Sequence, residues 1–528
     1  MGIIIKNGTI VDGTGGSAYS GDILIEEGII KDIGKIEISD NEHLVIDASG
    51  KVVSPGFIDT HSHSDLEILK NPFIEPKIRQ GITTEILGQD GISLAPLPEK
   101  YIEDWKKNIS GLDGTSDEIN WHFRDCIGYF NEIKKKGLAL NAAYLVPHGN
   151  IRMEVMGFEN KKANKEELEK MKMVLRRELD AGAIGLSTGL IYIPCAYADE
   201  EEILELCKVV REYERILVIH QRSEANDIIE SMKSVIDIAM NTGVKVHFSH
   251  FKICGKNNWH KIDEVMELLD NAKTNGLQIS FDQYPYTAGS TMLSVILPPW
   301  IHSGGTSRML KKLGEPDVKK KVIEEIKKTG CKWDNFIEFA GAEGIFITSV
   351  ASEKNSYAVG KSLCEIGDIL GMDPVEAAIE LIIEEQNAVG MIDYYGSEEH
   401  VIRMMKREEQ NLCTDGLLGG NPHPRVYGSF PRFMSKYVRE LKILTLEKAI
   451  YKITEKPAAL FKLPQRGNIK VGYKADIVIF DFDTIQDKGD FMNPRVFPVG
   501  IDYVIINGQV VFGLNKYFSE NSGNLINL

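Results

Sequence analysis

Two histidines stand one residue apart where a short apolar run ends, in the stretch PGFIDTHSHSD at residues 55–65. Side chains at positions i and i+2 of a strand point the same way, so His61 and His63 are expected to face one site. Neutral imidazole is a common zinc ligand, and two imidazoles at this spacing could hold a metal ion against water. The pair alone is a weak signal, because two surface histidines after a strand would give the same letters.

Three more polar side chains end apolar runs elsewhere in the chain. His220 closes ILVIH, His250 closes VKVHFSH, and Asp415 stands in LCTDG. Imidazole and carboxylate suit Zn²⁺, and strand ends that meet at one edge would bring these side chains together with the first pair. The sequence therefore predicts a divalent metal site at the carboxyl ends of several parallel strands.

The elements that must position these side chains alternate between short apolar runs and amphipathic stretches. In these stretches apolar residues recur at spacings of three and four residues, acidic residues stand near the start and glycine near the end. This pattern predicts helices at 165–182, 199–214 and 227–243. Eight units of strand and helix predict a (β/α)8 barrel of the TIM type, whose chemistry lies at the carboxyl ends of its strands. An open doubly wound sheet is the alternative. The runs that predict buried strands are VSPGFIDT, ITTEILG, ALNAAYLV, AIGLST, ILVIH, VKVHFSH, LQISFDQY and QNLCTDG.

Both ends of the chain have a different residue pattern from the middle. The first fifty and the last sixty residues contain short runs of β-branched residues, which are typical of strands. Tight turns are expected at the pairs Asn7–Gly8, Glu27–Gly28 and Asn507–Gly508. Chain ends often lie close in space, so these segments predict one small β-sandwich domain built from residues 1–54 and 465–528 together.

The length of 528 residues exceeds what one hydrophobic core usually supports, so a large domain with smaller attached units is expected. We assign residues 55–464 to the barrel. Within it, the gap between LQISFDQY and QNLCTDG is too long for one helix. This gap predicts an inserted lid subdomain at 288–350, followed by helices such as the one expected at Asp373–Gln386.

Composition excludes some partners. The net charge of −16 argues against nucleic acid or an anionic membrane surface as the main partner. The seven cysteines are scattered and form no CxxC pair, which suits a reducing compartment. No run approaches the length of a membrane span, and the first residues do not resemble a signal peptide, so a cytoplasmic location is expected.

Several stretches resemble the amidohydrolase superfamily and, within it, the D-aminoacylase family of N-acyl-D-amino-acid deacylases. Together they span nearly the whole chain. The superfamily resemblance is carried by PGFIDTHSHSD, the strand-end histidines, TDG and the closing TEKPAALFKLPQRGNIKVGYKADIVIFD; the family resemblance by GITTEILGQDGISLAP, GAIGLSTGLIYIP, SHFKICG, FDQYPYTAGS and HPRVYGSFPRF. The resemblance implies zinc-dependent hydrolysis of N-acyl-D-amino acids to a carboxylate and a free D-amino acid. It also implies a metal-bearing (β/α)8 barrel with a small β domain made from both chain ends.

The same resemblance assigns roles to the strand-end residues. It implies that His61 and His63 hold one metal position and that His220 and His250 hold the other. Asp415 would also reach the metal, take a proton from the attacking water, and return it to the departing amine.

One position departs from the family pattern. The family's deacylases commonly carry, in a GNCG turn, a cysteine that both metal positions share, whereas this chain has Asp90 in the turn GQDG at residues 88–91. A carboxylate can bind or bridge Zn²⁺ but is a harder ligand than a thiolate. Asp90 is therefore expected as a metal ligand, and one or two zinc ions per chain both stay open.

A substrate with a free carboxylate needs a cation nearby. Lys252 in SHFK and Arg425 in HPRVYG are suitable, Tyr284 in FDQYPY could add a hydroxyl, and Tyr192 in GLIYIP could line the pocket. The resemblance implies substrate contacts at Lys252, Tyr284 and Arg425. The same residue types would also fit a surface charge or a core aromatic.

Other polar residues are weaker candidates for the metal site. Glu85 is a second candidate carboxylate ligand, His148 ends another apolar run, His247 adjoins a site strand, and Cys413 is expected to be buried in its strand. The histidines in loops or helices are expected to be exposed or capping: His43, His122, His260, His302 and His400.

Three alternative functions are open. A cyclic amidase of the dihydropyrimidinase or dihydroorotase kind often uses a carboxylated barrel lysine, and no lysine lies at the strand ends between 137 and 190. A dipeptidase acting on a D-residue would share most of the site. A non-catalytic barrel homologue is disfavoured by the presence of all the strand-end ligands. In each enzyme the partner is a small molecule, and the oligomeric state stays open.

Overall fold

The protein is described by a computed structural model that covers residues 2–37, 43–519 and 521–528. Its centre is an eight-stranded sheet whose strands follow one another in the order β16-β12-β11-β10-β9-β8-β7-β6, all parallel. These strands are β6 (Phe57–Asp59), β7 (Ile82–Leu87), β8 (Asn141–Pro147), β9 (Gly185–Gly189), β10 (Ile216–His220), β11 (Lys245–Phe248), β12 (Ile279–Gln283) and β16 (Gln410–Leu412).

The sheet nearly closes into a barrel. A bridge between Ser62 and Gly416 and a hydrogen bond from the Asp415 amide to the His61 carbonyl (2.9 Å) join the ends of the first and last strands. A doubly wound sheet would reverse its strand order and leave two edges. The barrel prediction is therefore confirmed, and the open-sheet alternative is wrong.

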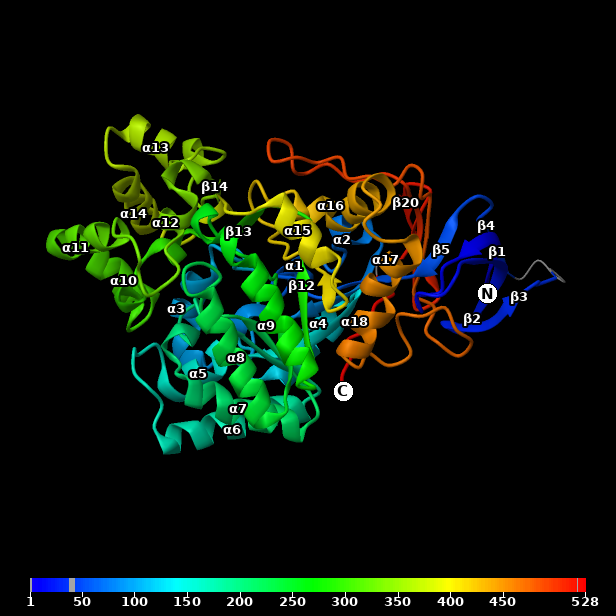
Figure 1. The fold of residues 1–528 in the computed structure, drawn as a ribbon, viewed down its shortest axis with the longest axis horizontal. Coiled ribbons are helices and arrows are strands. Elements are labelled where there is room, and N and C mark those ends of the chain that lie inside the picture. The colour runs from blue at the N-terminus through cyan, green and yellow to red at the C-terminus, as the bar shows by residue number, and fades with distance from the viewer. Residues whose placement is uncertain (1, 38–42, 520) are drawn as a thin grey trace.

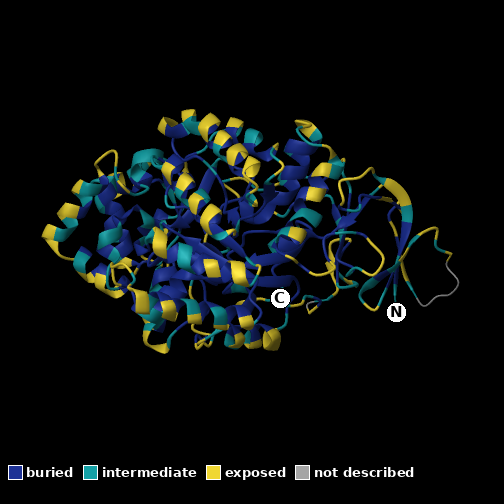
Figure 2. Cartoon of the chain, turned by 60° about the horizontal axis from the view of Figure 1, so that its bottom comes forward, coloured by how far each residue is buried: buried dark blue, intermediate teal, exposed yellow. Residues whose placement is uncertain are grey.

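Helices cover the outside of the barrel. The three helices expected from periodicity are confirmed as α6 (Lys165–Asp180), α7 (Glu200–Glu212) and α8 (Ile228–Thr242), and side chains of Asn164 and Asp199 cap the first two. Figure 2 shows exposed residues along the outer turns of such helices and buried strands within. The other helices of this layer are α1 (Glu67–Lys70), α2 (Glu75–Ile78), α3 (Ile102–Ile109), α4 (Cys126–Lys136), α5 (His148–Met156), α9 (Ile262–Thr274), α15 (Glu398–Met405), α16 (Arg425–Arg432), α17 (Leu446–Ile453) and α18 (Glu455–Leu460).

Both ends of the chain contribute to one nine-stranded sheet at one end of the molecule (Figure 1). The two segments join where β5 (Val52–Pro55) pairs antiparallel with β17 (Ile477–Phe480). Gly56 then leads directly into barrel strand β6. A Cβ on residue 56 would lie only 2.1 Å from Thr83 Oγ1, so the close approach needs glycine. The remaining strands are β1 (Ile3–Ile10), β2 (Tyr19–Glu26), β3 (Ile29–Gly34), β4 (Leu44–Asp47), β18 (Ile501–Ile506), β19 (Gln509–Gly513) and β20 (Lys516–Tyr517).

Two of the three expected tight turns form in this sheet. Glu27–Gly28 connects β2 to β3 and Asn507–Gly508 connects β18 to β19, with positive φ at all four residues, as hairpin turns of type I′ require. The prediction of a tight turn at Asn7–Gly8 is wrong. There β1 continues through a bulge, and Gly8 is placed so that a Cβ would lie 2.4 Å from Val53 Cγ2.

A separate layer stands at the opposite end of the molecule (Figure 1). Its antiparallel sheet has the order β13 (Ala288–Met292), β15 (Gly390–Tyr394), β14 (Ile345–Ser349). Around the sheet lie α10 (Thr306–Leu313), α11 (Pro316–Ile326), α12 (Phe336–Ala340), α13 (Leu363–Leu370) and α14 (Pro374–Glu384), which share one hydrophobic cluster.

This layer extends beyond the insertion expected at 288–350, because α14 and β15 belong to its core rather than to the barrel wall. The exact limits of the small β domain, the barrel and the lid stay predictions. Within the described residues, no helix is both long enough and apolar enough to cross a membrane.

Candidate active site and metal centre

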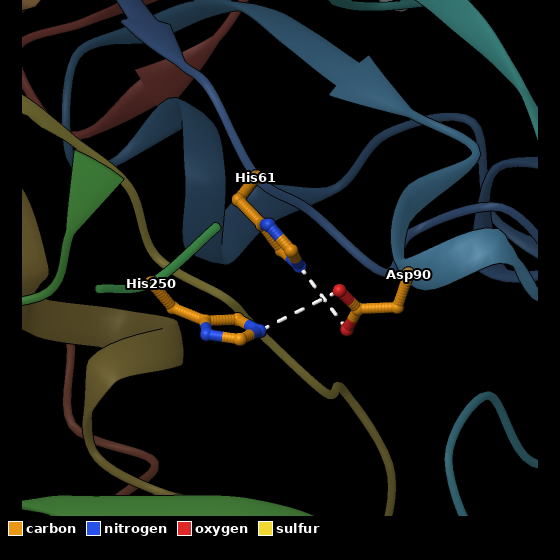
Figure 3. Close-up of side chains that lie close together, drawn as sticks. All are labelled: His61, Asp90 and His250. Carbon is orange, nitrogen blue, oxygen red and sulfur yellow. Dashed lines mark ion pairs between the residues drawn. The ribbon is translucent and has the colours of Figure 1, made fainter. Parts of the chain in front are cut away.

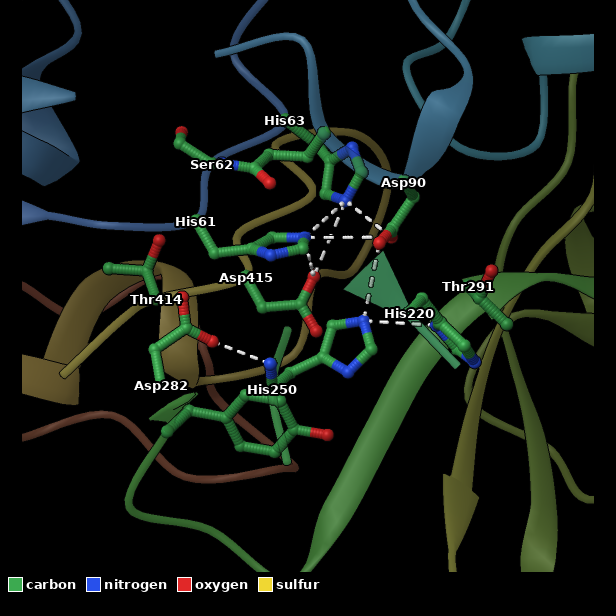
Figure 4. Close-up of polar contacts among 12 residues, drawn as sticks. His61, Ser62, His63, Asp90, His220, His250, Asp282, Thr291, Thr414 and Asp415 are labelled. Carbon is green, nitrogen blue, oxygen red and sulfur yellow. Dashed lines mark hydrogen bonds and ion pairs between the residues drawn. The ribbon is translucent and has the colours of Figure 1, made fainter. Parts of the chain in front are cut away.

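The strand-end residues converge on one buried cluster (Figure 4). His61 Nε2 and His63 Nε2 lie 3.3 Å apart, and His63 Nε2 lies 3.4 Å from Asp415 Oδ1. On the other side, His220 Nδ1 and His250 Nε2 lie 3.1 Å apart. The two histidine pairs predicted from separate strand ends therefore face one another.

Asp90 lies between the two pairs. Its Oδ2 is 3.5 Å from His61 Nε2 and its Oδ1 is 3.5 Å from His250 Nε2 (Figure 3). Its Oδ2 also lies 3.4 Å from His63 Nε2 (Figure 4). Each carboxylate oxygen thus faces a different histidine pair. A group that two metal positions share would need this placement.

The backbone that presents these groups is unusual. Asp90, His250 and Asp415 have φ values of 55°, 33° and 48°, a left-handed region that side chains other than glycine rarely adopt. Asp282 holds one of these bends, because its Oδ1 accepts a hydrogen bond from the His250 amide at 2.5 Å. Its other oxygen accepts one from Thr60 Oγ1 at 2.8 Å, so the carboxylate ties the seventh strand to the first.

The cluster fits a divalent metal ion. Ligand atoms lie within 4.8 Å of one another in three sets: His61 with Asp90 and His250, His61 with His63 and Asp415, and His220 with Glu224 and His250. Asp90 Oδ1 and His220 Nε2 are buried and have no hydrogen-bond partner among the described residues. Buried polar atoms are costly without partners, and a bound cation would satisfy these.

Electrostatics keep the carboxylates of the cluster charged. Burial alone would raise the pKa of Asp415, but the positive charges of Arg425 and His250 hold it well below its usual range. Burial likewise opposes a charge on His63, yet hydrogen bonds to Asp415 and Asp90 raise its pKa to about 10. Burial lowers the pKa of His220 to about 4, which leaves a neutral imidazole suited to metal binding.

Sequence reasoning missed Glu224, which lies in the loop after β10. Its Oε2 is 3.5 Å from His220 Nε2 and 2.7 Å from Lys252 Nζ, and its Oε1 is 3.4 Å from His250 Nδ1. Burial would raise its pKa, but the positive charge of Lys252, together with the neighbouring imidazoles of His220 and His250, lowers it to about 2. In the sequence, Glu224 could have been found only from its position four residues after His220. It was missed because the prediction used residues at strand ends, and no strand ends at Glu224.

Three of the residues expected to bind substrate line a cavity beside the cluster. Lys252, Tyr192 and Tyr284 border it together with His63, His250 and Asp415. The Tyr192 ring packs against His220 with centroids 5.5 Å apart, and Tyr284 Oη lies 2.5 Å from Tyr395 Oη. A second cavity of about 120 Å³ adjoins at Tyr192 and Phe336 and is lined mainly by apolar side chains.

The two expected carboxylate-binding cations are already paired. Lys252 contacts Glu224, and its Nζ also lies 2.7 Å from His250 Nδ1. Arg425 is fully buried, with Nη1 2.9 Å from Asp415 Oδ2 and Nη2 donating to the Ser290 carbonyl at 3.0 Å. The surface-charge alternative is wrong for both.

Glu85 does not join the metal cluster. It is buried in an ion pair with Lys77 (2.8 Å), which also pairs with Asp59 (2.6 Å). Ser62 Oγ, between the two histidines of the first pair, donates to Glu85 Oε1 at 2.9 Å. Glu85 therefore lies next to the segment that carries His61 and His63 and stabilises it. The expectation that Glu85 could be a metal ligand is wrong.

The remaining histidines and cysteine lie outside the cluster. His148 bonds to Thr188 and Glu202, and His247 bonds to Asp282 (2.9 Å), so His247 supports the carboxylate that shapes the His250 bend. Cys413 is buried, as expected. His400 was expected to be exposed or capping, but it lies on α15 and is buried, with 7% exposure. His122 and His260 are exposed, and His43 and His302 are half-buried.

Comparisons with known proteins agree with this geometry. The pattern of the amidohydrolase family matches residues 44–284 and 402–512, leaving out the whole layer from β13 to β15. A D-aminoacylase of Alcaligenes xylosoxydans xylosoxydans is 31% identical over 99% of this chain and 97% of its own length. An N-acyl-D-glutamate deacylase of the same organism is 32% identical over 97% of this chain and 94% of its own length.

Solved structures show the same relationship. An N-acyl-D-glutamate deacylase from Bordetella bronchiseptica, complexed with zinc and a phosphonate mimic of the tetrahedral intermediate, is 30% identical, with a TM-score of 0.85 and full coverage of both chains. A D-aminoacylase described with a binuclear metal centre is 31% identical, with a TM-score of 0.83 over 100% of this chain and 99% of that one. A dihydropyrimidinase from Brevibacillus agri, at 16% identity and a TM-score of 0.57, shares the fold.

Proposed function

The chain belongs to the amidohydrolase family, and we propose that it hydrolyses the amide bond of N-acyl-D-amino acids with zinc held by its histidine cluster. The observation that carries this proposal is the position of Asp90 between two histidine pairs, with Asp415 beside the first pair. The similarity to D-aminoacylase and to the N-acyl-D-glutamate deacylase supports the substrate class.

The ligand assignment follows the distances. His61 and His63 would hold one position, His220 and His250 the other, and Asp90 would serve both. These donors suffice for one or two zinc ions. Because a carboxylate is harder than a thiolate, Asp90 is expected to hold zinc less tightly than a cysteine would.

The residues of this chain then divide the chemistry. A bound zinc ion would supply Lewis acidity that polarises the scissile carbonyl and lowers the pKa of water. Asp415 accepts a proton from the attacking water and returns it to the nitrogen of the departing amine. Arg425 keeps Asp415 ionised for the first of these transfers.

The substrate carboxylate would bind near Lys252 and Arg425. Both cations already have acidic partners, so the carboxylate would join existing ion pairs rather than meet a free charge. Tyr284 stands over this region, with the Arg425 guanidinium 4.5 Å from its ring centroid. Tyr192 would face the reacting amide from the His220 side.

The cyclic-amidase alternative is less well supported. Asp90 occupies the place between the histidine pairs where many such enzymes use a carboxylated lysine, so this site needs no such group. A D-residue dipeptidase shares the same cluster and differs only in the acyl part of its substrate.

A direct test measures amine release from paired N-acetyl-D- and N-acetyl-L-amino acids, with zinc content determined on the same sample. Turnover of the D-series, with at least one zinc per chain, is the expected result. Zinc without turnover of either series would contradict the substrate class and leave the hydrolytic centre intact. Absence of both would contradict the proposal as a whole.

A further inference from the structure

Asp393 brings an additional carboxyl group to the substrate cavity. It lies on β15 with 3% exposure and lines the cavity together with Lys252, Tyr284 and Asp415. Its cross-strand partner on β13 is Gly289, where a Cβ would stand only 2.9 Å from Asp393 Oδ1. The glycine therefore leaves the space that the Asp393 carboxyl occupies.

Asp393 differs from the other buried acids of this cavity in its partners. Asp415 is paired with Arg425 at 2.9 Å, and Glu224 with Lys252 at 2.7 Å. Across the described chain, Asp393 has neither an ion pair nor a side-chain hydrogen bond, and its own backbone amide is the only donor that acts on it. Burial raises its pKa to about 7, although Lys252 and Arg425 act in the opposite direction.

We propose that Asp393 binds an ammonium or guanidinium group of the substrate. Arg425 is paired with Asp415 and Lys252 with Glu224, and Asp334, another acid that lines the cavity, accepts hydrogen bonds from Ser223 Oγ and the Glu224 amide. Among the described residues, Asp393 is thus the acid of this cavity with neither an ion pair nor a side-chain hydrogen bond. A buried carboxylate gains most from a charged hydrogen-bond donor, and an arriving cation would supply one. This inference rests on the proposed function and narrows its substrate class.

The position of Asp393 favours the side chain of the D-residue as the source of this cation. Lys252, one of the groups assigned to the substrate α-carboxylate, lines the same cavity as Asp393. The D side chain branches from the carbon that carries that carboxylate, so it would lie nearer than the acyl group. An N-acyl-D-lysine is the simplest such substrate. The amino end of an aminoacyl group, as in a dipeptide, is the other source of the same chemistry.

The test compares substrates that differ by one amino group, in wild type and in Asp393→Asn. N-acetyl-D-lysine against N-acetyl-D-norleucine reports on the side chain, and glycyl-D-norleucine against N-acetyl-D-norleucine reports on the acyl end. We expect wild type to prefer one cationic substrate by about tenfold or more in kcat/KM, and D393N to abolish that preference. Turnover of N-acetyl-D-norleucine should stay within about threefold, because it makes no use of the charge.

The conservative variant Asp393→Glu separates charge recognition from shape. It should restore part of the preference that D393N loses, whereas a merely structural role would leave D393E and D393N alike. Equal effects of D393N on cationic and neutral substrates, or no preference in wild type, would overturn the inference while turnover of N-acetyl-D-norleucine upholds the proposed function. If wild type turns over none of these substrates, the proposed function fails. In that case, calorimetry on wild type and D393N measures the dissociation constants of the same cationic and neutral compounds. Tighter binding of a cationic compound by wild type that D393N loses would support the role of Asp393, and equal binding would overturn it.

Discussion

Arg425 Nη1 lies 2.9 Å from Asp415 Oδ2, while Oδ1 of the same carboxylate faces His63 Nε2 at 3.4 Å. One side of the Asp415 carboxylate is thus held by a buried guanidinium, and the other is turned toward the histidine cluster. Arg425 is itself fixed through the Ser290 carbonyl on β13. The arginine assigned from sequence to substrate binding therefore also orients Asp415 and maintains its charge.

Replacing Asp415 by asparagine tests its role in proton transfer. Asparagine keeps the shape but cannot accept a proton, so kcat should fall by about 10²–10⁴-fold, with a smaller change in KM. Steady-state kinetics on protein with measured zinc content would check this. Activity near that of wild type at unchanged zinc content would reject Asp415 as the proton acceptor.

Replacing Arg425 by alanine tests how the charge on Asp415 is maintained. Arg425 lowers the pKa of Asp415. The proposed proton transfer needs this acid in its ionised form. Without the guanidinium that pKa rises, so the acid limb of the kcat profile should move to higher pH, and activity should recover partly as pH increases. The variant R425K keeps the charge and should move the limb less. Identical acid limbs in wild type and R425A would show that the pairing does not control protonation.

The sequence was sufficient to locate the centre of the site because barrel strands end at one face. His61, His63, His220, His250 and Asp415 each follow an apolar run, and that local signal was enough to predict their convergence. Asp90 needed the family resemblance, since no strand pattern distinguishes a turn carboxylate that lies between two histidine pairs. Their mutual distances follow from barrel closure and could not be obtained from the letters.

Residues outside the strand ends escaped prediction for physical reasons. Glu224 lies in a loop, Lys77 in a short helix, and Asp393 on a strand of the layer above the barrel, so their roles depend on long-range contacts. The packing of α14 with the antiparallel layer also escaped prediction, because its amphipathic pattern is the same as that of a barrel helix. The Asn7–Gly8 pair forms a bulge because Val53 on a distant strand packs beside the glycine.

If Asp90 is a metal ligand, as we propose, it should control how firmly zinc is held. Asp90→Ala removes the carboxylate that lies between the histidine pairs, so zinc content and activity should both fall. Asp90→Cys introduces a softer ligand and should retain zinc against a chelator longer than wild type does. Zinc analysis after dialysis against dipicolinate, followed by activity on zinc return, measures both effects. Unchanged zinc retention in D90A would show that Asp90 is not a ligand.

Lys77 stabilises the seam where the barrel closes. It is fully buried, pairs with Asp59 (2.6 Å) and Glu85 (2.8 Å), and donates hydrogen bonds to Ser62 Oγ (2.8 Å) and Thr414 Oγ1 (2.7 Å). One ammonium thus connects the first, second and last strands. Lys77→Met would leave two buried carboxylates without their cation, which typically costs about 3–5 kcal/mol of unfolding free energy.

The denaturation midpoint of K77M should therefore fall markedly. Catalytic activity should fall with it, because Ser62 and Thr414 adjoin His61, His63 and Asp415 in the chain. Lys170→Met is the matched control. Its ion pair with Glu166 (2.7 Å) lies on an outer helix with both side chains exposed, so the midpoint should change little. Equal midpoints for K77M and K170M would mean that the buried pairs do not stabilise the seam. A stability loss in K77M with full activity in the remaining folded protein would separate barrel closure from placement of the catalytic groups.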